Sequence, residues 1–484
     1  MTVLELLQRG VAAYGEREFL RFPAESRSVT FAEADERSDR IAQSLIDRGA
    51  RPGDRVAVML DNVPEWPLSW FAILKAGAII VPINVRYRAA DLDFVLTDSG
   101  ASGVITSSSY APLVEETGGT VWPVDTLGDA DRATAVAARP SDIANFQYTS
   151  GTTGFPKACI LTHEYWTDNA QVIADGVGLR ANDVMIIAQA FSYLDPQWAT
   201  LMCLVGGIPV VVLPRFSASG FWKSVRKEGA TLTYVLGTMP LLLYKQPPDP
   251  LDRDHRMRLV LCSGIQPDLH QALEDRWGVA WRELYGSTES GLDLMVPADD
   301  TASVGTGALG QPPPGKEVKV LPDTGEIVVR GRPMMKGYWN YPDVFGDGWY
   351  HTGDLGVVDE HGNIHHAGRL KDMVRRGGEN ISCAEVERVL TQHPAVLSAA
   401  LVPIPDDLWG ELPKAFIQLQ PGHQPIKDTA LSIADHARNR LAKFKVPEYI
   451  EFVDGFSLTP SARIEKHQLL QPERDQRANS WRTT

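Results

Sequence analysis

The segment YTSGTTGFPK, at residues 148–157, has the composition of a phosphate-binding loop. Glycine lets the backbone approach a ligand closely, and successive backbone N–H groups in such a loop point towards anionic oxygens. The hydroxyls add donors, and Lys157 adds a mobile positive charge. Gly and Ser also occur in ordinary surface turns, but the three threonines and the Pro-Lys ending favour an anion site. The sequence does not follow the common P-loop pattern.

Three further motifs carry hydroxyl and charged residues: YGSTES at 285–290, GWYHTGDLG at 348–356 and GRLKDMVRRGGEN at 368–380. With the first loop, and in this order, they resemble the adenylate-forming superfamily, which contains acyl-CoA synthetases, luciferases and peptide-synthetase adenylation domains. The resemblance covers about residues 1–470. The compact ending without a carrier domain favours the acyl-CoA synthetase branch, with carnitine- and crotonobetaine-type and fatty or aryl acid CoA ligases as the nearest types.

The resemblance implies a two-step reaction that uses ATP, Mg²⁺ and CoA. A small-molecule carboxylate would attack the α-phosphate of ATP, giving an acyl-adenylate and pyrophosphate. The CoA thiol would then displace AMP and form a thioester. We therefore expect an ATP-dependent, AMP-forming acyl-CoA synthetase, in which the loop at 148–157 holds the departing β- and γ-phosphates.

The resemblance also implies roles for single residues. Tyr285 would stack on adenine, Thr288 would bond the α-phosphate, and Glu289 would bind Mg²⁺, which prefers oxygen ligands. Asp354 would accept the ribose hydroxyls, and Arg369 would also reach the ribose. The expected nucleotide-binding residues are Thr149, Ser150, Gly151, Thr152, Thr153, Gly154, Lys157, Ser263, Gly264, Tyr285, Gly286, Ser287, Thr288, Asp354 and Arg369.

Three of these residues have a simpler structural alternative. Glu289 alone is more often a surface carboxylate at a helix start. Asp354 and Arg369 can form an ordinary salt bridge. The combination of motifs favours the nucleotide roles.

The resemblance places a hinge at Lys371, where Lys or Asp is usual, and a passage for the pantetheine arm of CoA at Gly377 and Gly378. Hinge residues absorb backbone rotation while lying far from the chemistry. A solvated charge and two turn glycines are the alternatives.

The acyl pocket is expected in FSYLDPQW (191–198) and LGTMP (236–240). An aromatic group beside a carboxylate suits a polar or cationic acyl group. The alternative is a helix start, with Asp195 as N-cap, Pro196 at the first position and Trp198 in the core. The expected acyl-contacting residues are Tyr193, Asp195, Trp198, Gly237, Thr238 and Gly264.

The stretch TPSARIEK, at 459–466, departs from the family pattern P-S/T-G-K. Ala462 replaces the glycine, and Arg463 replaces the lysine that bridges the carboxylate and the α-phosphate during adenylation. Planar Arg is not interchangeable with compact Lys. Three outcomes stay open: Arg463 does this work, Lys466 reaches in from one helical turn away, or the enzyme performs one half-reaction while a partner ligase supplies the other. We place the full two-step ligase first.

The elements that must position these residues form a large α/β region. Thr30 and Glu33 have the capping-box pattern of a helix over 30–49, and a strand–helix–strand pattern follows over 55–84. Strand-like runs recur at 103–107, 184–189, 210–214, 233–237 and 259–264. These predict parallel-sheet α/β layers.

The pattern changes after about residue 300, where turn residues and short alternating runs predict a β-rich subdomain over about 300–370. A small, mobile α+β domain is expected beyond it. We predict an N-terminal domain over 1–370 and a C-terminal domain over 371–484, with the hinge at Lys371.

Composition excludes several classes of protein. A net charge of −14 argues against nucleic-acid binding, and the apolar runs are too short for stable membrane insertion. The widely spaced cysteines, Cys159, Cys203, Cys262 and Cys383, suit free buried thiols in a reducing compartment. We expect a cytoplasmic protein and leave its oligomeric state open, with a homodimer as a candidate.

Overall fold

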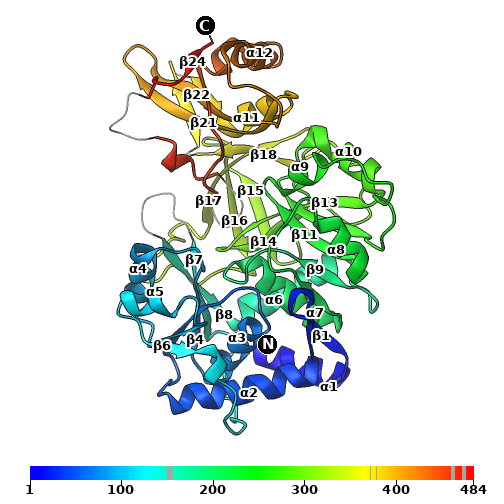
Figure 1. Cartoon of the computed structure of the whole chain (residues 1–484), viewed down its shortest axis with the longest axis vertical. Coiled ribbons are helices and arrows are strands. Elements are labelled where there is room, and N and C mark those ends of the chain that lie inside the picture. The colour runs from blue at the N-terminus through cyan, green and yellow to red at the C-terminus, as the bar shows by residue number, and fades with distance from the viewer. Residues whose placement is uncertain (150–155, 371, 378, 459–463, 471–475, 484) are drawn as a thin grey trace. The chain divides into compact units, whose positions relative to one another are not determined.

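The computed structural model describes the chain except residues 150–155, 371, 378, 459–463, 471–475 and 484 (Figure 1). It divides into two compact units. The first contains Met1–Val318 and Val329–Tyr350, and the second contains Lys319–Val328 and His351–Thr484.

An eight-stranded sheet forms one half of the first unit, in the order β14-β13-β12-β11-β9-β10-β1-β2. Its inner pairs are parallel, and the pairs at its two edges are antiparallel. β11 and β10 are buried along their whole length, as expected for parallel strands covered on both faces. The strands are β1 (Glu18–Phe22), β2 (Arg27–Thr30), β9 (Met185–Ile187), β10 (Val210–Val212), β11 (Leu232–Leu236), β12 (Leu259–Ser263), β13 (Ala280–Ser287) and β14 (Gly291–Met295).

A six-stranded sheet forms the other half, in the order β6-β5-β3-β4-β7-β8. Only β7 and β8 pair antiparallel within it. The strands are β3 (Arg55–Met59), β4 (Ile79–Pro82), β5 (Gly103–Thr106), β6 (Val121–Pro123), β7 (Ile143–Thr149) and β8 (Lys157–Thr162).

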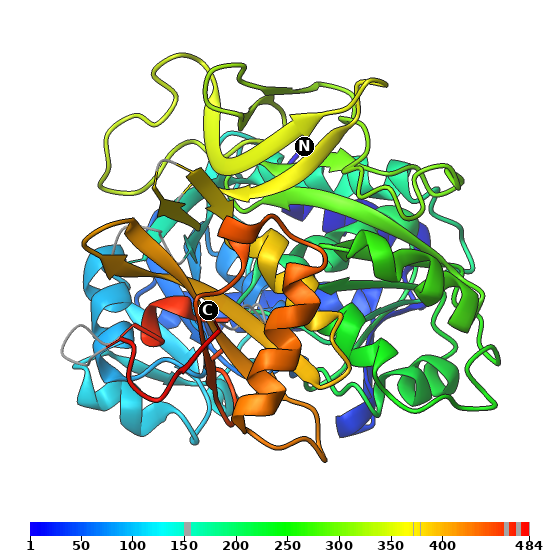
Figure 2. The ribbon, with the colours of Figure 1, turned by 90° about the horizontal axis from the view of Figure 1, so that it is seen from above.

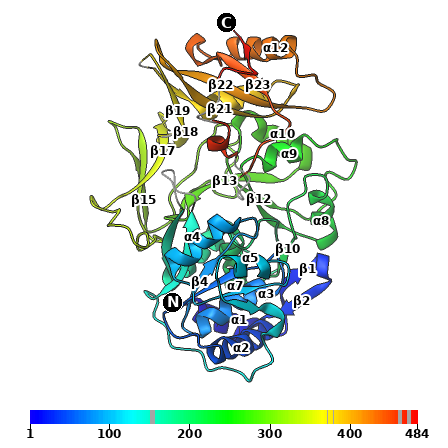
Figure 3. The same ribbon diagram turned by 60° about the vertical axis from the view of Figure 1, so that its left-hand side comes forward.

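After α1, which precedes the first strand, the helices of this unit connect strands, as the alternating pattern predicts. Helices α1, α2 and α3 pack together at one end of the unit (Figure 3). The helices are α1 (Val3–Tyr14), α2 (Phe31–Asp47), α3 (Glu65–Lys75), α4 (Ala89–Ser99), α5 (Ala111–Glu116), α6 (His163–Gly176), α7 (Leu194–Gly206), α8 (Phe221–Glu228), α9 (Met239–Tyr244) and α10 (Pro267–Trp277).

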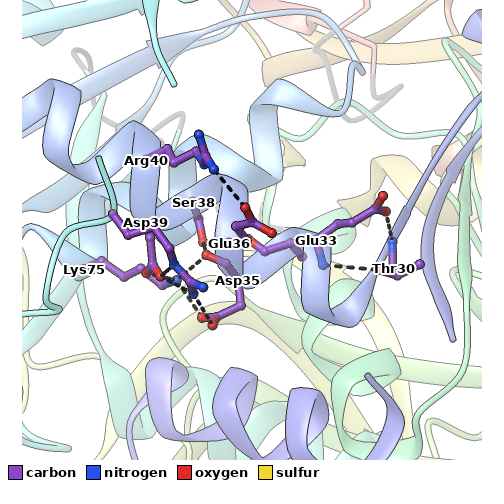
Figure 4. A network of polar contacts seen from close by, with 10 residues as sticks. Thr30, Glu33, Asp35, Glu36, Ser38, Asp39, Arg40 and Lys75 are labelled. Atoms are coloured by element: carbon purple, nitrogen blue, oxygen red, sulfur yellow. Dashed lines mark hydrogen bonds and ion pairs between the residues drawn. The ribbon is translucent and has the colours of Figure 1, made fainter. Parts of the chain in front are cut away.

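The start of α2 shows the predicted capping box (Figure 4). The Glu33 N–H donates to Thr30 Oγ1 at 3.1 Å, and the Thr30 N–H donates to Glu33 Oε2 at 2.8 Å. Further along, buried Lys75 from α3 contacts Asp35 and Asp39 of α2, at 2.6 Å each. A buried ion pair therefore joins these two helices.

A four-stranded sheet, in the order β15-β16-β17-β18, lies mainly in the second unit. Its strands are β15 (Lys316–Val320), β16 (Glu326–Gly331), β17 (Tyr350–Val358) and β18 (Ile364–Arg369).

The last part of the second unit contains a sheet in the order β20-β19-β22-β23-β24, with β21 also paired to β22. Two helices lie beside its long strands (Figure 2), and apolar residues from both helices and the sheet form one core. The elements are β19 (Met373–Arg376), β20 (Glu379–Ser382), α11 (Cys383–Thr391), β21 (Val396–Asp406), β22 (Gly410–Leu419), α12 (Lys427–Arg438), β23 (Tyr449–Phe452) and β24 (Trp481–Arg482).

These elements confirm the predicted α/β class, with a large N-terminal part built on parallel sheets and a smaller C-terminal domain. The four cysteines are free and buried, as predicted. The described helices include none that is long and apolar enough to cross a membrane. The boundary at residue 370 and the hinge stay predictions, because Lys371 lies outside the described residues.

Candidate active site

The predicted phosphate loop connects β7 to β8. These strands are antiparallel, and Thr149 lies opposite Lys157. The structure therefore fixes the two ends of the loop next to each other. The predictions for Ser150, Gly151, Thr152, Thr153 and Gly154 fall outside the described residues.

The YGSTES motif approaches the end of this loop within the first unit. Tyr285, Gly286 and Ser287 end β13, and Thr288 and Glu289 follow in the turn to β14. The Thr149 hydroxyl donates to Glu289 Oε1 at 3.4 Å. Two motifs that are far apart in the sequence thus meet at the Glu289 carboxylate.

Sequence reasoning missed Tyr338, which also contacts this carboxylate. Its hydroxyl donates to Glu289 Oε1 at 2.7 Å. Burial and the neighbouring Glu289 raise the pKa of Tyr338 well above its usual value, so the phenol stays protonated and can donate. The Lys157 ammonium lies 5.4 Å from the centre of the Tyr338 ring.

A buried ion pair, also missed, supports the turn that carries Glu289. Lys316 Nζ donates to the Ser290 carbonyl at 2.6 Å and lies 3.3 Å from Asp293 Oδ1. The side chains of Lys316 and Asp293 are 0% and 1% exposed. Burial raises the pKa of Asp293 to about 6 against the opposing effect of Lys316. A charged residue inside the apolar run GLDLM was the available signal in the sequence.

The carboxyl ends of β11 and β12 bring together Gly237, Ser263 and Gly264. The Gly237 N–H donates to the Ser263 carbonyl at 3.0 Å. Buried Glu283 accepts the N–H of Gly264 at 2.7 Å and of Ile265 at 2.9 Å. Burial raises the pKa of Glu283 to about 7. Glu283 therefore fixes the backbone of a turn where ligands of parallel sheets commonly bind.

Helix α7 begins earlier in the expected acyl segment than the structural alternative predicts. Tyr193 is the N-cap, so Asp195 is the second helical residue and Pro196 the third. The alternative that Asp195 caps the helix with Pro196 at the first position is therefore wrong. Trp198 is 2% exposed, and its ring packs edge-on against Tyr234 at 5.4 Å.

Two other residues of the expected pocket have clear positions. Tyr193 Oη accepts a hydrogen bond from the amide of buried Asn84. Thr238 is the N-cap of α9, and its side chain does not cap the helix. The acyl roles of these residues stay predictions.

Asp354 and Arg369 pair in the second unit. They lie opposite each other on β17 and β18, and Arg369 Nε is 2.7 Å from Asp354 Oδ1. The simpler salt-bridge alternative is thus present. The Asp354 side chain is 10% exposed and that of Arg369 is 41% exposed, so a ribose would have to compete for a carboxylate that is already paired.

Gly377 has a φ of 56°, which favours glycine. A Cβ atom here would lie 2.7 Å from the Trp409 ring, so a side chain has no room. This agrees with the turn-glycine alternative and leaves the CoA role a prediction. Gly378 lies outside the described residues.

Lys466 is engaged within the second unit. Its Nζ is 2.7 Å from both carboxylate oxygens of Asp372 and 2.7 Å from Glu387 Oε1. Burial raises the pKa of Glu387 to about 7. Lys466 therefore forms ion pairs inside the second unit. Ala462 and Arg463 lie outside the described residues.

Comparison with known protein families identifies the family of this chain. The model of the AMP-binding enzyme family matches residues 7–339, and that of the AMP-binding enzyme C-terminal domain matches residues 385–463. The chain belongs to the AMP-binding enzyme family.

This AMP-binding enzyme is similar to acyl-CoA synthetases along most of its length. It is 34% identical over 470 residues to feruloyl-CoA synthase of an Amycolatopsis species, covering 91% of this chain and 93% of the relative. It is 31% identical over 506 residues to crotonobetaine/carnitine–CoA ligase of Salmonella paratyphi B, covering 94% and 96%.

A solved structure agrees. The o-succinylbenzoate-CoA synthetase of Bacillus subtilis, in complex with its acyl-adenylate intermediate, matches this AMP-binding enzyme with a TM-score of 0.87. The two are 29% identical, and the match covers 97% of this chain and 98% of the other. The predicted membership of the acyl-CoA synthetase branch is confirmed, and these comparisons do not favour the half-reaction alternative.

The residues around Glu289 suit a Mg²⁺ ion that protein and nucleotide coordinate together. Among the described residues, no three His, Cys, Asp or Glu side chains form a ready metal cluster. Mg²⁺ commonly takes one or two carboxylates and completes its shell with water and substrate phosphate. The half-buried carboxylate of Glu289, beside the end of the phosphate loop, suits that mode.

Proposed function

We propose that this acyl-CoA synthetase activates a small carboxylic acid with ATP and transfers the acyl group to CoA. In the first step a carboxylate oxygen bonds to the α-phosphorus while the bond to pyrophosphate breaks. In the second step the CoA sulfur bonds to the acyl carbon, its proton leaves, and AMP departs. The observation that carries this proposal is the meeting of Thr149, Lys157 and Glu289 at one place in the first unit.

The residues divide the first step between them. Lys157 and the hydroxyls of residues 149–153 bind the β- and γ-phosphates, while Tyr285 stacks on adenine. Thr288 bonds the α-phosphate, and Asp354 with Arg369 binds the ribose. Preorganised donors of this kind stabilise charge that develops in the transition state.

Glu289 is the residue that would hold Mg²⁺. When bound, the cation supplies positive charge that neutralises the phosphate oxygens. The turn behind Glu289 is fixed by the buried pair Lys316 and Asp293, so the carboxylate needs little rearrangement to reach its ligand.

Arg463 provides the positive charge that the family's lysine would give. This assignment is supported by the pairing of Lys466 with Asp372 and Glu387, because Lys466 is already committed to those carboxylates. Arg463 would lie between the substrate carboxylate and the α-phosphate during adenylation.

The acid would carry an aromatic or polar group. The aromatic pair of Trp198 and Tyr234, with the Tyr193 hydroxyl close to Asn84, supports this class. Relatives named for feruloyl, crotonobetaine or carnitine, and o-succinylbenzoate substrates fall into it.

The cysteines and the net charge indicate the compartment and the partners of the protein. Four buried free cysteines suit a reducing cytoplasm, and a net charge of −14 disfavours nucleic acids and anionic membranes as partners. We propose a homodimer as the assembly to test by light scattering.

The test is a panel of carboxylic acids incubated with the protein, ATP, Mg²⁺ and CoA, with AMP and thioester measured separately. A preferred acid should yield AMP and thioester in equal amounts. If no acid yields AMP or pyrophosphate, the proposal is wrong. Rapid thioester formation from supplied acyl-adenylates without pyrophosphate exchange would instead support a half-reaction enzyme with a partner ligase.

A further inference from the structure

Residues 336–339 run antiparallel to β8 and join it through an isolated β-bridge, although they lie far from it in the sequence. The backbone of Ile160 in β8 both donates to the Gly337 carbonyl and accepts from the Lys336 N–H, at 2.9 Å each. The Trp339 N–H donates to the Ala158 carbonyl at 2.9 Å. This register places Tyr338 opposite Cys159, two residues from Lys157.

Side chains anchor the end of this segment as well. The Trp339 indole donates to the Asp98 carbonyl at 3.0 Å, and the Asn340 amide donates to Asp98 Oδ1 at 3.2 Å. The Tyr148 hydroxyl donates to Asp98 Oδ2 at 2.6 Å. The position of Tyr338 is therefore set by backbone and side-chain contacts that do not involve a ligand.

From this position Tyr338 approaches two charged residues of the candidate site, Glu289 and Lys157. Its hydroxyl donates to Glu289 Oε1 at 2.7 Å. Its ring centre lies 5.4 Å from the Lys157 ammonium, which is also 4.5 Å from the ring centre of Tyr341. Thr149 approaches the same Oε1 atom of Glu289, at 3.4 Å.

Long charged side chains lose rotamer freedom when a ligand orders them, and preorganisation removes that cost. An aromatic face attracts an ammonium group without neutralising it, so Lys157 keeps its charge for phosphate. Hydrogen bonds from Tyr338 and Thr149 to Oε1 hold the Glu289 carboxylate in one orientation.

We infer that Tyr338 is a positioning residue that orients Glu289 for a phosphate-bound divalent cation and Lys157 for the phosphates. The inference rests on the proposed function, and it adds a residue to which neither the motifs nor the comparisons assign a role. The hydroxyl of Tyr338 orients the Glu289 carboxylate, and its ring orients the Lys157 ammonium group.

The test compares Tyr338→Phe with Tyr110→Phe in the full chain. Both variants remove a hydroxyl that donates to a carboxylate, because Tyr110 donates to Asp61 at 2.8 Å on the surface. Calorimetry measures ATP binding with and without Mg²⁺, and pyrophosphate exchange measures adenylation across Mg²⁺ concentrations.

Tyr338→Phe should weaken Mg²⁺-dependent ATP binding about tenfold, the usual scale for losing a residue that orients a metal ligand. It should raise the Mg²⁺ concentration for half-maximal adenylation similarly, while ATP binding without Mg²⁺ stays within about twofold of wild type. Tyr110→Phe should match wild type in both measurements. Tyr338→Leu, which also removes the ring, should weaken ATP binding without Mg²⁺ too.

Equal Mg²⁺ dependence in wild type and Tyr338→Phe would overturn the inference and leave the proposed function intact. A wild-type protein that does not bind ATP with Mg²⁺ would instead overturn the proposed function itself, and this inference with it. Wild-type ATP binding therefore tests the proposed function, and Tyr338→Phe tests the inference, since it removes a single oxygen atom and keeps the ring.

Discussion

Arg463 stands where the family pattern P-S/T-G-K has a lysine. A guanidinium is broader than an ammonium and offers its donors in a fixed plane, so it can bridge a carboxylate and a phosphate, though in a different geometry from lysine. The rival cation, Lys466, is held by two carboxylates of the second unit. The two residues should therefore respond differently to substitution.

Arg463→Met should slow adenylation by about 100-fold or more, because losing one preorganised donor to a developing charge costs that much in other enzymes. Thioester formation from a supplied acyl-adenylate should change less than about threefold, since that step does not need this charge. Pyrophosphate exchange and thioester formation, measured separately, give the comparison.

Lys466→Met is the matched control for Arg463→Met. It leaves Asp372 and Glu387 without their cation, so it should lower stability and reduce both half-reactions together. A selective loss of adenylation in Lys466→Met, with Arg463→Met near wild type, would show that the assignment of Arg463 is wrong.

At the scale of elements, buried polar contacts tie helices to each other around the two sheets of the first unit. α2 and α3 are joined by Lys75, and α1 meets the start of α6 where the Val3 N–H donates to His163 Nδ1 at 3.3 Å. Burial makes such contacts sensitive to the loss of a partner and to protonation.

Lys75→Met should lower the free energy of unfolding by about 3 kcal/mol, because it leaves Asp35 and Asp39 without their buried cation. Arg40→Met, on the same helix, removes only an exposed ion pair with Glu36 and should cost less than about 0.5 kcal/mol. Urea unfolding of both variants measures the difference, and equal effects would contradict the role of Lys75.

His163 should make stability depend on pH. Burial lowers the pKa of His163 to about 4 from an ordinary 6.5. As the pH falls through this window, the unfolded chain takes up a proton that the folded chain refuses, so stability is lost. From pH 6.5 to pH 5 the loss should be about 1.6 kcal/mol.

His163→Gln provides the control for this pH dependence, because glutamine does not titrate. Urea unfolding of the two proteins at a series of pH values cancels the contribution of all other groups. The stability of wild type relative to His163→Gln should fall by the same amount between pH 6.5 and pH 5, and a constant difference would contradict a buried neutral imidazole.

The whole molecule consists of two compact units, and the predicted hinge, Lys371, lies in the sequence directly before Asp372 and β19. A two-step reaction with one hinge requires backbone rotation between the steps. Proline fixes φ near −65° and removes the backbone N–H, so it tests this requirement directly.

Lys371→Pro should keep adenylation within about threefold of wild type and slow overall thioester formation at least about tenfold, since only one arrangement stays accessible. Lys427→Pro is the control, because Lys427 is the first residue of α12, where proline is tolerated. Equal effects on both half-reactions in Lys371→Pro would contradict a hinge at this residue.

Local sequence predicted the features that depend on local physics. The capping box of Thr30 and Glu33 and the buried strands of the parallel sheets each follow from neighbouring residues. The helix start at Asp195 was misplaced by two positions, because proline is also accepted at the third position of the first turn, where no intrahelical N–H bond is lost.

The sequence by itself determined the family, the reaction class and the ordered motifs, because these are written in residue types at fixed spacing. Only the tertiary structure decided that Tyr338 supports Glu289 and Lys157, that Lys316 and Asp293 fix the turn behind them, and that Lys466 is committed to the second unit. Contacts between residues distant in the chain depend on how sheets and turns bring segments together, and no local pattern encodes that.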